Sequence, residues 1–132
     1  MQIYSKGANV DKPNSLTPAE LAFVGDAVHT LFVRHHILQK GGRISNINRV
    51  CAKYCSAVCQ SKVLERVHAN LDEKENEIVR RGRNFASKTR AKNASVEEYR
   101  NATAFETLVG FLYLEKNTER LQQILDWSVE EI

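Results

Sequence analysis

The stretch LAFVGDAVHTLFVRHHIL, residues 21–38, decides the fold, because it is apolar over most of its length and carries one carboxylate, Asp26. The preceding TPAE, residues 17–20, combines an N-cap threonine, a proline at the first helical position and a capping-box glutamate. Two consecutive glycines follow Lys40 and are typical of a helix end. The sequence therefore predicts a helix that ends near Gln39 and holds an acid in apolar company.

A second apolar stretch, TAFETLVGFLYL at residues 103–114, carries Glu106 in the same way. A buried carboxylate without a partner is costly, so each acid needs a compensating group. One interpretation pairs each acid with an arginine or a backbone amide in a structural network. The other brings both acids to one divalent cation, because Mg²⁺ prefers oxygen ligands and is held by one or two carboxylates together with phosphates.

A glycine accompanies each of these acids. Gly25 adjoins Asp26, and Gly110 lies one turn after Glu106. Glycine inside a helix costs about 1 kcal/mol relative to alanine, so both positions need a packing or functional reason. We expect another helix, or a ligand, to approach closely there.

The helix over residues 17–39 is apolar on two sides. At 100° per residue, one side forms a stripe that we expect in the core: Leu21, Val24, Val28, Leu31 and Phe32. The opposite side carries Asp26, and its other members are Ala19, Ala22, Phe23 and Val33. A helix that is apolar nearly all round is expected to be central or to lie at a subunit interface.

Capping and breaking signals predict helices along the rest of the chain. We expect a helical region from Ser45 that breaks near Ser56, a helix capped by Asp72 and ending at Gly82, a loop over residues 83–94, a helix capped by Ser95 and reaching about Lys116, and a last helix capped by Thr118. These elements predict an all-α single domain over residues 1–132, with its core at about 16–130.

Positive charge is concentrated in one part of the chain. Six bases and no acid occur between Ile78 and Val96, namely Arg80, Arg81, Arg83, Lys88, Arg90 and Lys92. Because the net charge of the whole chain is only +3, the remainder is slightly acidic. A basic stretch can be merely solvated surface, but its concentration here favours a polyanion as partner.

The three cysteines, Cys51, Cys55 and Cys59, are spaced by four and so lie along one face of a helix. Their odd number and the lack of nearby ligands predict buried reduced thiols rather than a disulfide or a metal site. The sequence also lacks an apolar run of the roughly 18 residues that a membrane span needs, and lacks a signal-peptide core. We therefore expect a cytoplasmic protein, or one of an organellar matrix or stroma.

FVGDAV, residues 23–28, resembles the signature of the ribonuclease III family, and TAFETLVGFLYL resembles that family's second acidic helix. Further similarity lies in SAVCQSKVL at residues 56–64 and RRGRN at residues 80–84. The length, and the absence of a double-stranded-RNA-binding domain, are similar to the Mini-ribonuclease III subfamily. The resemblance covers the chain from about Leu16 to Leu114.

The resemblance implies an all-helical homodimer that hydrolyses double-stranded RNA with Mg²⁺, for which Mn²⁺ can substitute. It implies that Asp26 and Glu106 are the catalytic metal ligands, while Ala22 and Thr103 occupy the positions of two further family acids. It also implies maturation of the precursor of the large-subunit ribosomal RNA. The six bases would then bind RNA, and His29, His35 and His36 are expected to be packing or surface groups, since a metal-activated water needs no histidine base.

Two alternatives remain open. The loss of two family acids is compatible with a non-catalytic protein of the same fold that binds double-stranded or ribosomal RNA. In the other alternative, both acids form structural ion pairs, and the basic stretch meets an acidic protein.

Overall fold

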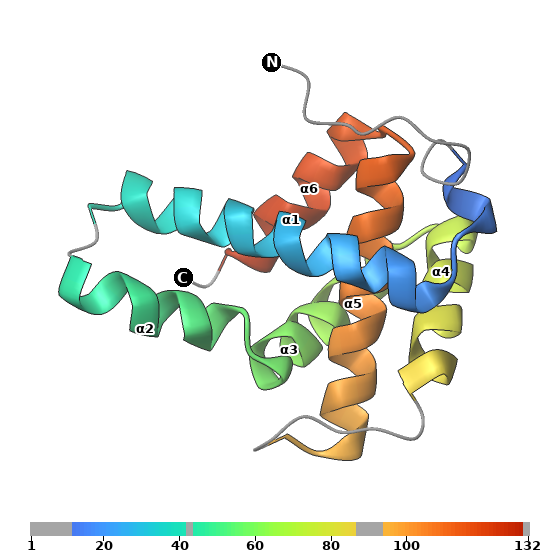
Figure 1. The fold of residues 1–132 in the computed structure, drawn as a ribbon, viewed down its shortest axis with the longest axis horizontal. Helices are drawn as coiled ribbons and strands as arrows, with labels where there is room; N and C mark the ends of the chain where they lie inside the picture. Colours follow the sequence, from blue (N-terminus) through green and yellow to red (C-terminus); the bar gives the residue numbers. More distant parts are fainter. Residues whose placement is uncertain (1–11, 42–43, 87–93, 131–132) are drawn as a thin grey trace.

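The computed structural model describes residues 12–41, 44–86 and 94–130, which form helices joined by short connections (Figure 1). The α-helices are α1 (Pro18–Gln39), α2 (Ile44–Tyr54), α3 (Ala57–Val67), α4 (Glu73–Phe85), α5 (Val96–Leu114) and α6 (Thr118–Ser128). Two short 3-10 helices, Pro13–Ser15 and His68–Asn70, complete the assigned elements. The described residues contain no strand, so the predicted all-α class is confirmed.

The helix starts follow the predicted capping signals closely. Thr17, Asp72 and Ser95 each accept a hydrogen bond from the backbone of the residue three positions later, and the acid there bonds back, so three capping boxes form. Ser56 caps α3, as the predicted break requires. Asn117, and not Thr118, caps α6, because the Asn117 side chain accepts from the Arg120 amide.

The predicted end of α4 at Gly82 is wrong, since the helix continues to Phe85. Gly82 serves packing instead of termination. A Cβ atom placed on it would lie 2.7 Å from Thr107 Oγ1 and 2.8 Å from the Ala104 Cα atom, both on α5. Consequently Arg83, expected in a loop, lies on a helix.

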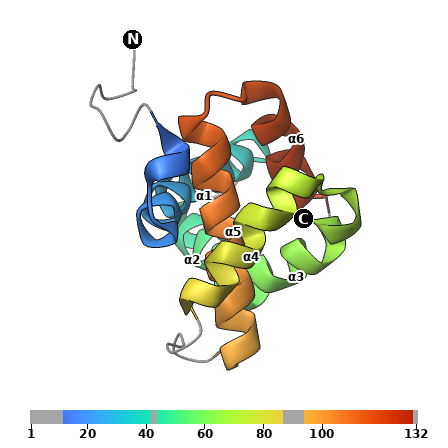
Figure 2. The ribbon, with the colours of Figure 1, turned by 90° about the vertical axis from the view of Figure 1, so that its right-hand side faces the viewer.

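Helix α5 is the centre of the fold. Figures 1 and 2 show it running through the middle of the molecule, with α1, α3 and α4 packed around it. From Asn101 to Leu114, only Glu106 and Tyr113 retain partial exposure. A helix that is apolar on every side is stable only when other elements cover it, so the arrangement of the other helices follows from α5.

The two glycines beside the acids explain how α1 crosses α5. A Cβ atom on Gly25 would lie 1.8 Å from the Glu106 carbonyl oxygen, and one on Gly110 would lie 1.8 Å from the Leu21 carbonyl oxygen. The backbones therefore touch at this point, and no larger residue fits on either helix. This close contact is a packing reason for the presence of glycine inside both helices.

The buried line of α1 differs from the predicted stripe. It consists of Leu21, Gly25, His29, Val33 and Ile37, spaced by four. Leu31, expected in the core, is 65% exposed, and Val33, expected on the other side, is fully buried. The glycine contact fixes the rotation of α1, so the line through Gly25 faces the core in place of the most apolar stripe. No described helix combines the length and hydropathy needed to cross a membrane.

Candidate active site

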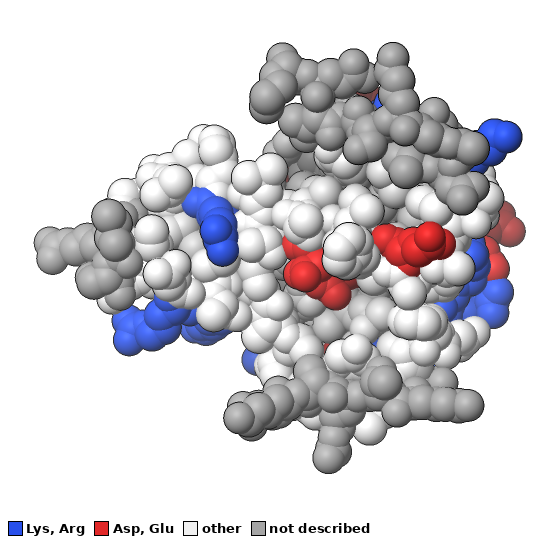
Figure 3. All heavy atoms as spheres, in the orientation of Figure 1, with Lys and Arg blue, Asp and Glu red and all other residues white. Residues whose placement is uncertain are grey.

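Asp26 and Glu106 come together where α1 crosses α5. Asp26 follows Gly25 directly, and the carbonyl that Gly25 contacts belongs to Glu106 itself. Asp26 is exposed and Glu106 partly exposed, so the pair lies at the surface and not in the sealed core. Figure 3 shows one acidic group over the middle of α1 and a second toward its N-terminal end, with uncharged atoms between them.

The two carboxyls interact directly. Burial, repulsion from Asp26 and a hydrogen bond shared with Asp26 together raise the pKa of Glu106 to about 8, against a smaller opposite effect of Gln60. Burial is the largest cause of this rise, and the like charge of Asp26 adds to it. Among the described residues, neither acid forms a salt bridge with a lysine or arginine. The structural ion-pair interpretation therefore has no support here.

The donor set suits a hard divalent cation. Two carboxylates supply only oxygen, which Mg²⁺ prefers, and a cation between them would relieve their repulsion. The described residues contain no group of three or more His, Cys, Asp or Glu side chains that could form a complete protein cage. Two carboxylates would leave positions on such a cation for water and a phosphate, as is usual for Mg²⁺.

Behind the acids lies a buried polar contact that the sequence did not single out. Gln60 on α3 and His29 on α1 are each 2% exposed, and Gln60 Nε2 lies 3.0 Å from His29 Nδ1. Gln60 Nε2 also donates to Glu106 Oε2 at 3.5 Å. One feature of the sequence pointed to a buried Gln60. It shares a side of α3 with three apolar residues, Val63, Leu64 and Val67, all of them buried.

His29 is a packed, neutral histidine, as predicted for a packing group. Burial lowers the pKa of His29 to about 4, although the charge of Asp26 opposes this shift. The imidazole ring meets the Phe105 ring edge-on, with centroids 5.0 Å apart and planes at 82°. By contrast, His35 is exposed and His36 is partly buried, stacked on Phe32.

Three of the six predicted RNA-binding bases are described, and all three have protein partners. Arg80 pairs with Glu77, Arg83 pairs with Glu97, and the Arg81 guanidinium donates to the Leu16 carbonyl. The other three, Lys88, Arg90 and Lys92, fall outside the described residues.

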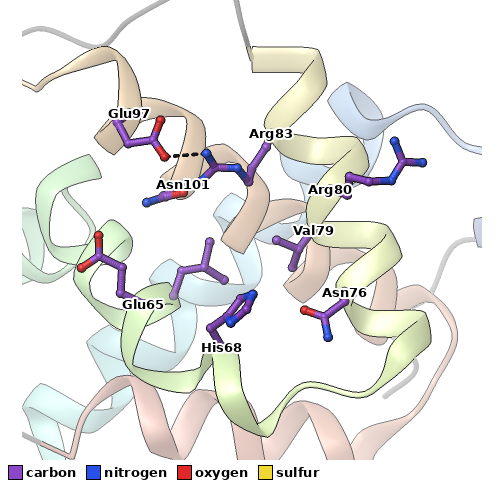
Figure 4. Close-up of a pocket in the computed structure, with 9 residues that line it drawn as sticks. Glu65, His68, Asn76, Val79, Arg80, Arg83, Glu97 and Asn101 are labelled. Carbon is purple, nitrogen blue, oxygen red and sulfur yellow. Dashed lines mark hydrogen bonds and ion pairs between the residues drawn. The ribbon is translucent and has the colours of Figure 1, made fainter.

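Arg80 and Arg83 also line an open hollow of about 640 Å³ between α3, α4 and α5 (Figure 4). The hollow contains acidic as well as basic groups, since Glu65 and Glu97 line it too. Figure 4 shows the Arg83 side chain directed toward Glu97, while that of Arg80 extends away from the hollow. The described part of the basic stretch is therefore a mixed surface, and these two arginines are already engaged with carboxylates.

The cysteines are free thiols, as predicted, but only Cys51 is buried. They do not share one helix face, because α2 ends at Tyr54 and α3 begins at Ala57, which leaves Cys55 between the two helices. Cys51 Sγ and Cys55 Sγ lie 4.0 Å apart. Burial is the main cause that raises the pKa of Cys55 to about 12. This thiol is consequently protonated near neutral pH, and a protonated thiol is neither a nucleophile nor a metal ligand.

The fold and the site define a class of all-helical proteins that carry two acids where two helices cross. Comparison with known proteins shows which family of this class the chain resembles. The ribonuclease III domain matches residues 19–117. The chain is 44% identical over 119 residues to the Mini-ribonuclease 3 of a Thermoanaerobacter species, covering 89% of this chain and 84% of that protein. It is 38% identical to the Mini-ribonuclease 3 of Streptococcus pneumoniae over 122 residues, covering 90% and 95% of the two chains.

A crystal structure of a Fusobacterium nucleatum protein is similar as well. It superposes with a TM-score of 0.78 at 34% identity, covering 85% of this chain and 90% of that one. The chain belongs to the ribonuclease III family and, with it, to the endoribonucleases.

Proposed function

We propose that this protein uses Mg²⁺, or Mn²⁺ in its place, to hydrolyse phosphodiesters of double-stranded RNA and leave 5′-phosphate ends. The observation that supports this most is the meeting of Asp26 and Glu106, two acids 80 positions apart in the sequence, where Gly25 on α1 touches the backbone of Glu106 on α5. Their mutual repulsion without a cation is the property expected of a pair that shares one.

In this proposal the two carboxylates are the catalytic metal ligands. A bound Mg²⁺ supplies charge stabilisation for the phosphate and activation of the attacking water. Glu106 has to lose its proton before it can act as a ligand, because metal ligands bind in their deprotonated form. Asp26 holds the exposed side of the pair, where an RNA phosphate can approach. His29 does not serve as base, because its Nδ1 atom is already engaged by Gln60.

The proposed active form is a homodimer joined through the outer face of α1. That face presents Phe23, Leu31 and Leu38, which are 83%, 65% and 62% exposed. Three large apolar side chains on one helix are unusual on a surface that stays in water and are typical of an interface. In the dimer, each subunit would cut one strand of the duplex.

The proposed substrate is the precursor of the large-subunit ribosomal RNA, and the proposed location is the cytoplasm or an organellar matrix or stroma, where that RNA is made. The Mini-ribonuclease 3 name of the relatives and the length shared with them support this choice. A-form RNA is recognised through its shape, phosphates and 2′-hydroxyl groups. The bases Arg80, Arg81, Arg83, Lys88, Arg90 and Lys92 would supply the phosphate contacts.

The decisive experiment incubates the purified protein with a long RNA duplex, with and without Mg²⁺, beside the Asp26→Asn variant. We expect Mg²⁺-dependent fragments from the wild-type protein and none from the variant, which should still fold and bind the duplex. Cleavage by the variant would remove Asp26 from the mechanism.

Duplex binding without cleavage in the same assay would mean that this member of the family has kept the fold and lost hydrolysis. That outcome would assign the loss to Ala22 and Thr103, which stand where the resemblance places two further family acids.

A further inference from the structure

We propose that Gln60 is a positioning residue for the Glu106 carboxylate and that His29 fixes the orientation of the Gln60 amide. This inference rests on the proposed function, since it assigns Glu106 a metal to bind. It adds two residues, on α3 and α1, that act on the site without touching the RNA.

The contacts form a chain of three polar groups from three helices. His29 Nδ1 lies 3.0 Å from Gln60 Nε2, and Gln60 Nε2 lies 3.5 Å from Glu106 Oε2. The second distance is at the outer limit of a hydrogen bond. Contacts of this kind are often long before the ligands are bound and shorten in the loaded site.

The donor and acceptor roles follow from chemistry. An ionised carboxylate only accepts hydrogen bonds, so the Gln60 amide must turn its NH₂ group, and not its oxygen, toward Glu106. The same nitrogen faces His29, so Nδ1 of His29 must be the acceptor and the ring proton must lie on Nε2. One tautomer of His29 thereby selects the orientation in which Gln60 can donate to Glu106.

The group is held firmly by its surroundings. His29 and Gln60 are each 2% exposed, and His29 packs edge-on against Phe105, the residue before Glu106. Buried amides rarely rotate when both hydrogens are engaged, because a flip would leave an unpaired group costing about 1–3 kcal/mol. Partners that orient metal ligands in this way typically change metal affinity or activity about 10- to 100-fold when removed.

The test uses Gln60→Met, which keeps the length of the side chain and removes the donor. Calorimetric titration with Mn²⁺ alone should show affinity weakened about 10- to 100-fold relative to wild type. For duplex cleavage, kcat should fall to a similar extent while KM for RNA stays unchanged, because Gln60 does not contact the substrate.

Ser61→Ala is the matched control. Ser61 adjoins Gln60 on α3 and is 3% exposed. Its hydroxyl accepts a hydrogen bond from Asn101 on α5 at 3.0 Å, so Ser61 is as buried as Gln60 but bonds to a different residue of α5. Its loss should lower the melting temperature and leave Mn²⁺ affinity and kcat within twofold of wild type. If Ser61→Ala reduced both as strongly as Gln60→Met, general loosening of α3 would explain the effect, and the proposal would be overturned.

The role of His29 is tested with His29→Phe, which keeps an aromatic ring against Phe105 and removes the acceptor. This variant should weaken Mn²⁺ binding less than Gln60→Met, and the double variant should be no weaker than Gln60→Met alone, because both act through one carboxylate. Additive losses would show that His29 acts independently and would overturn its assigned role.

Failure of this inference is distinguishable from failure of the proposed function. If the wild-type protein neither binds Mn²⁺ nor cuts RNA, the proposed function is wrong and the positioning role falls with it. If the wild-type protein does both and a folded Gln60→Met variant equals it, only the positioning role is wrong.

Discussion

Gly25 and Gly110 face each other where α1 crosses α5, and each leaves space that the other helix's backbone fills. A Cβ atom on either residue would lie 1.8 Å from a carbonyl oxygen of the opposite helix, that of Glu106 or that of Leu21. Real Cβ atoms do not approach that closely, so a side chain at either position must push the helices apart. Since Asp26 and Glu106 flank this contact, the glycines control how near the two acids come.

Gly25→Ala should destabilise the protein strongly. Helix propensity alone would favour alanine by about 1 kcal/mol. Overpacking against backbone should instead cost about 3 kcal/mol or more, because backbone cannot move aside as a side chain can. Urea titrations of the wild-type and variant proteins would give the difference in free energy of unfolding. A stabilised variant would contradict the close contact of α1 with α5.

The stability of the metal-free protein should fall as the pH rises from 6.5 to 8. Burial and Asp26 raise the pKa of Glu106 to about 8, so the folded protein keeps a proton that the unfolded chain has already lost above its ordinary value of 4.5. The unfolded state therefore binds fewer protons in this range, and the free energy of unfolding decreases with pH. Below 6.5 the lowered pKa of His29 acts in the opposite direction, so the effect of Glu106 is clearest above it.

Asp26→Asn supplies the control for this pH dependence. The substitution removes the like charge, although burial of Glu106 remains, so the decline above pH 6.5 should become shallower. Urea titrations at several pH values in the presence of a chelator would measure it. An equal slope in wild type and variant would mean that the two carboxyls do not interact.

Leu31→Glu should prevent dimer formation. Leu31 is 65% exposed on the outer face of α1, and a charge buried at the centre of an apolar interface weakens association by orders of magnitude. Sedimentation equilibrium should then find a dimer for wild type and a monomer for the variant. Val96→Glu is the matched control, because Val96 is 44% exposed at the start of α5 and away from this face. A dimeric Leu31→Glu variant would place the interface elsewhere.

Replacing Arg80 and Arg83 together by Gln should weaken duplex binding and reduce its salt dependence. If both arginines contact phosphates, the slope of log affinity against log salt should become shallower by about 1–2. Fluorescence anisotropy at several salt concentrations would measure the slope. Arg49→Gln with Lys53→Gln, two exposed bases on α2, is the control of equal charge. The same slope in wild type and the Arg80 and Arg83 variant would mean that their carboxylate partners, Glu77 and Glu97, already occupy these arginines.

Local signals in the sequence predicted most of the fold, and tertiary contacts explain where they failed. Thr17, Asp72 and Ser95 act through backbone groups three residues away, so their capping roles could be predicted without knowing the fold. Gly82 and Leu31 depend on what the neighbouring helix presents. Gly82 lies inside α4, where the absence of a side chain lets Thr107 and Ala104 of α5 pack against the helix. Leu31 faces outward because the contact at Gly25 fixes the rotation of α1.

In the candidate site, too, some residues could be proposed from local sequence and others only from tertiary contacts. Asp26 and Glu106 could be proposed from the sequence as candidates, because an acid in an apolar helix is visible in one segment at a time. Gln60 and His29 could not be assigned to the site in advance, because their connection to Glu106 joins three helices and depends on distances that no single segment contains. A polar residue in the buried line of α3 was the only trace of it.

The main-chain contact between α1 and α5 also has a consequence for how this protein can diverge over generations. Backbone carbonyl groups and the two glycines set the separation of the two acids. The shapes of the surrounding leucine and valine side chains contribute little to it, and carbonyl groups are present whatever the sequence. Distant descendants could therefore exchange most of their interior and preserve the spacing of the acids, provided that both glycines persist.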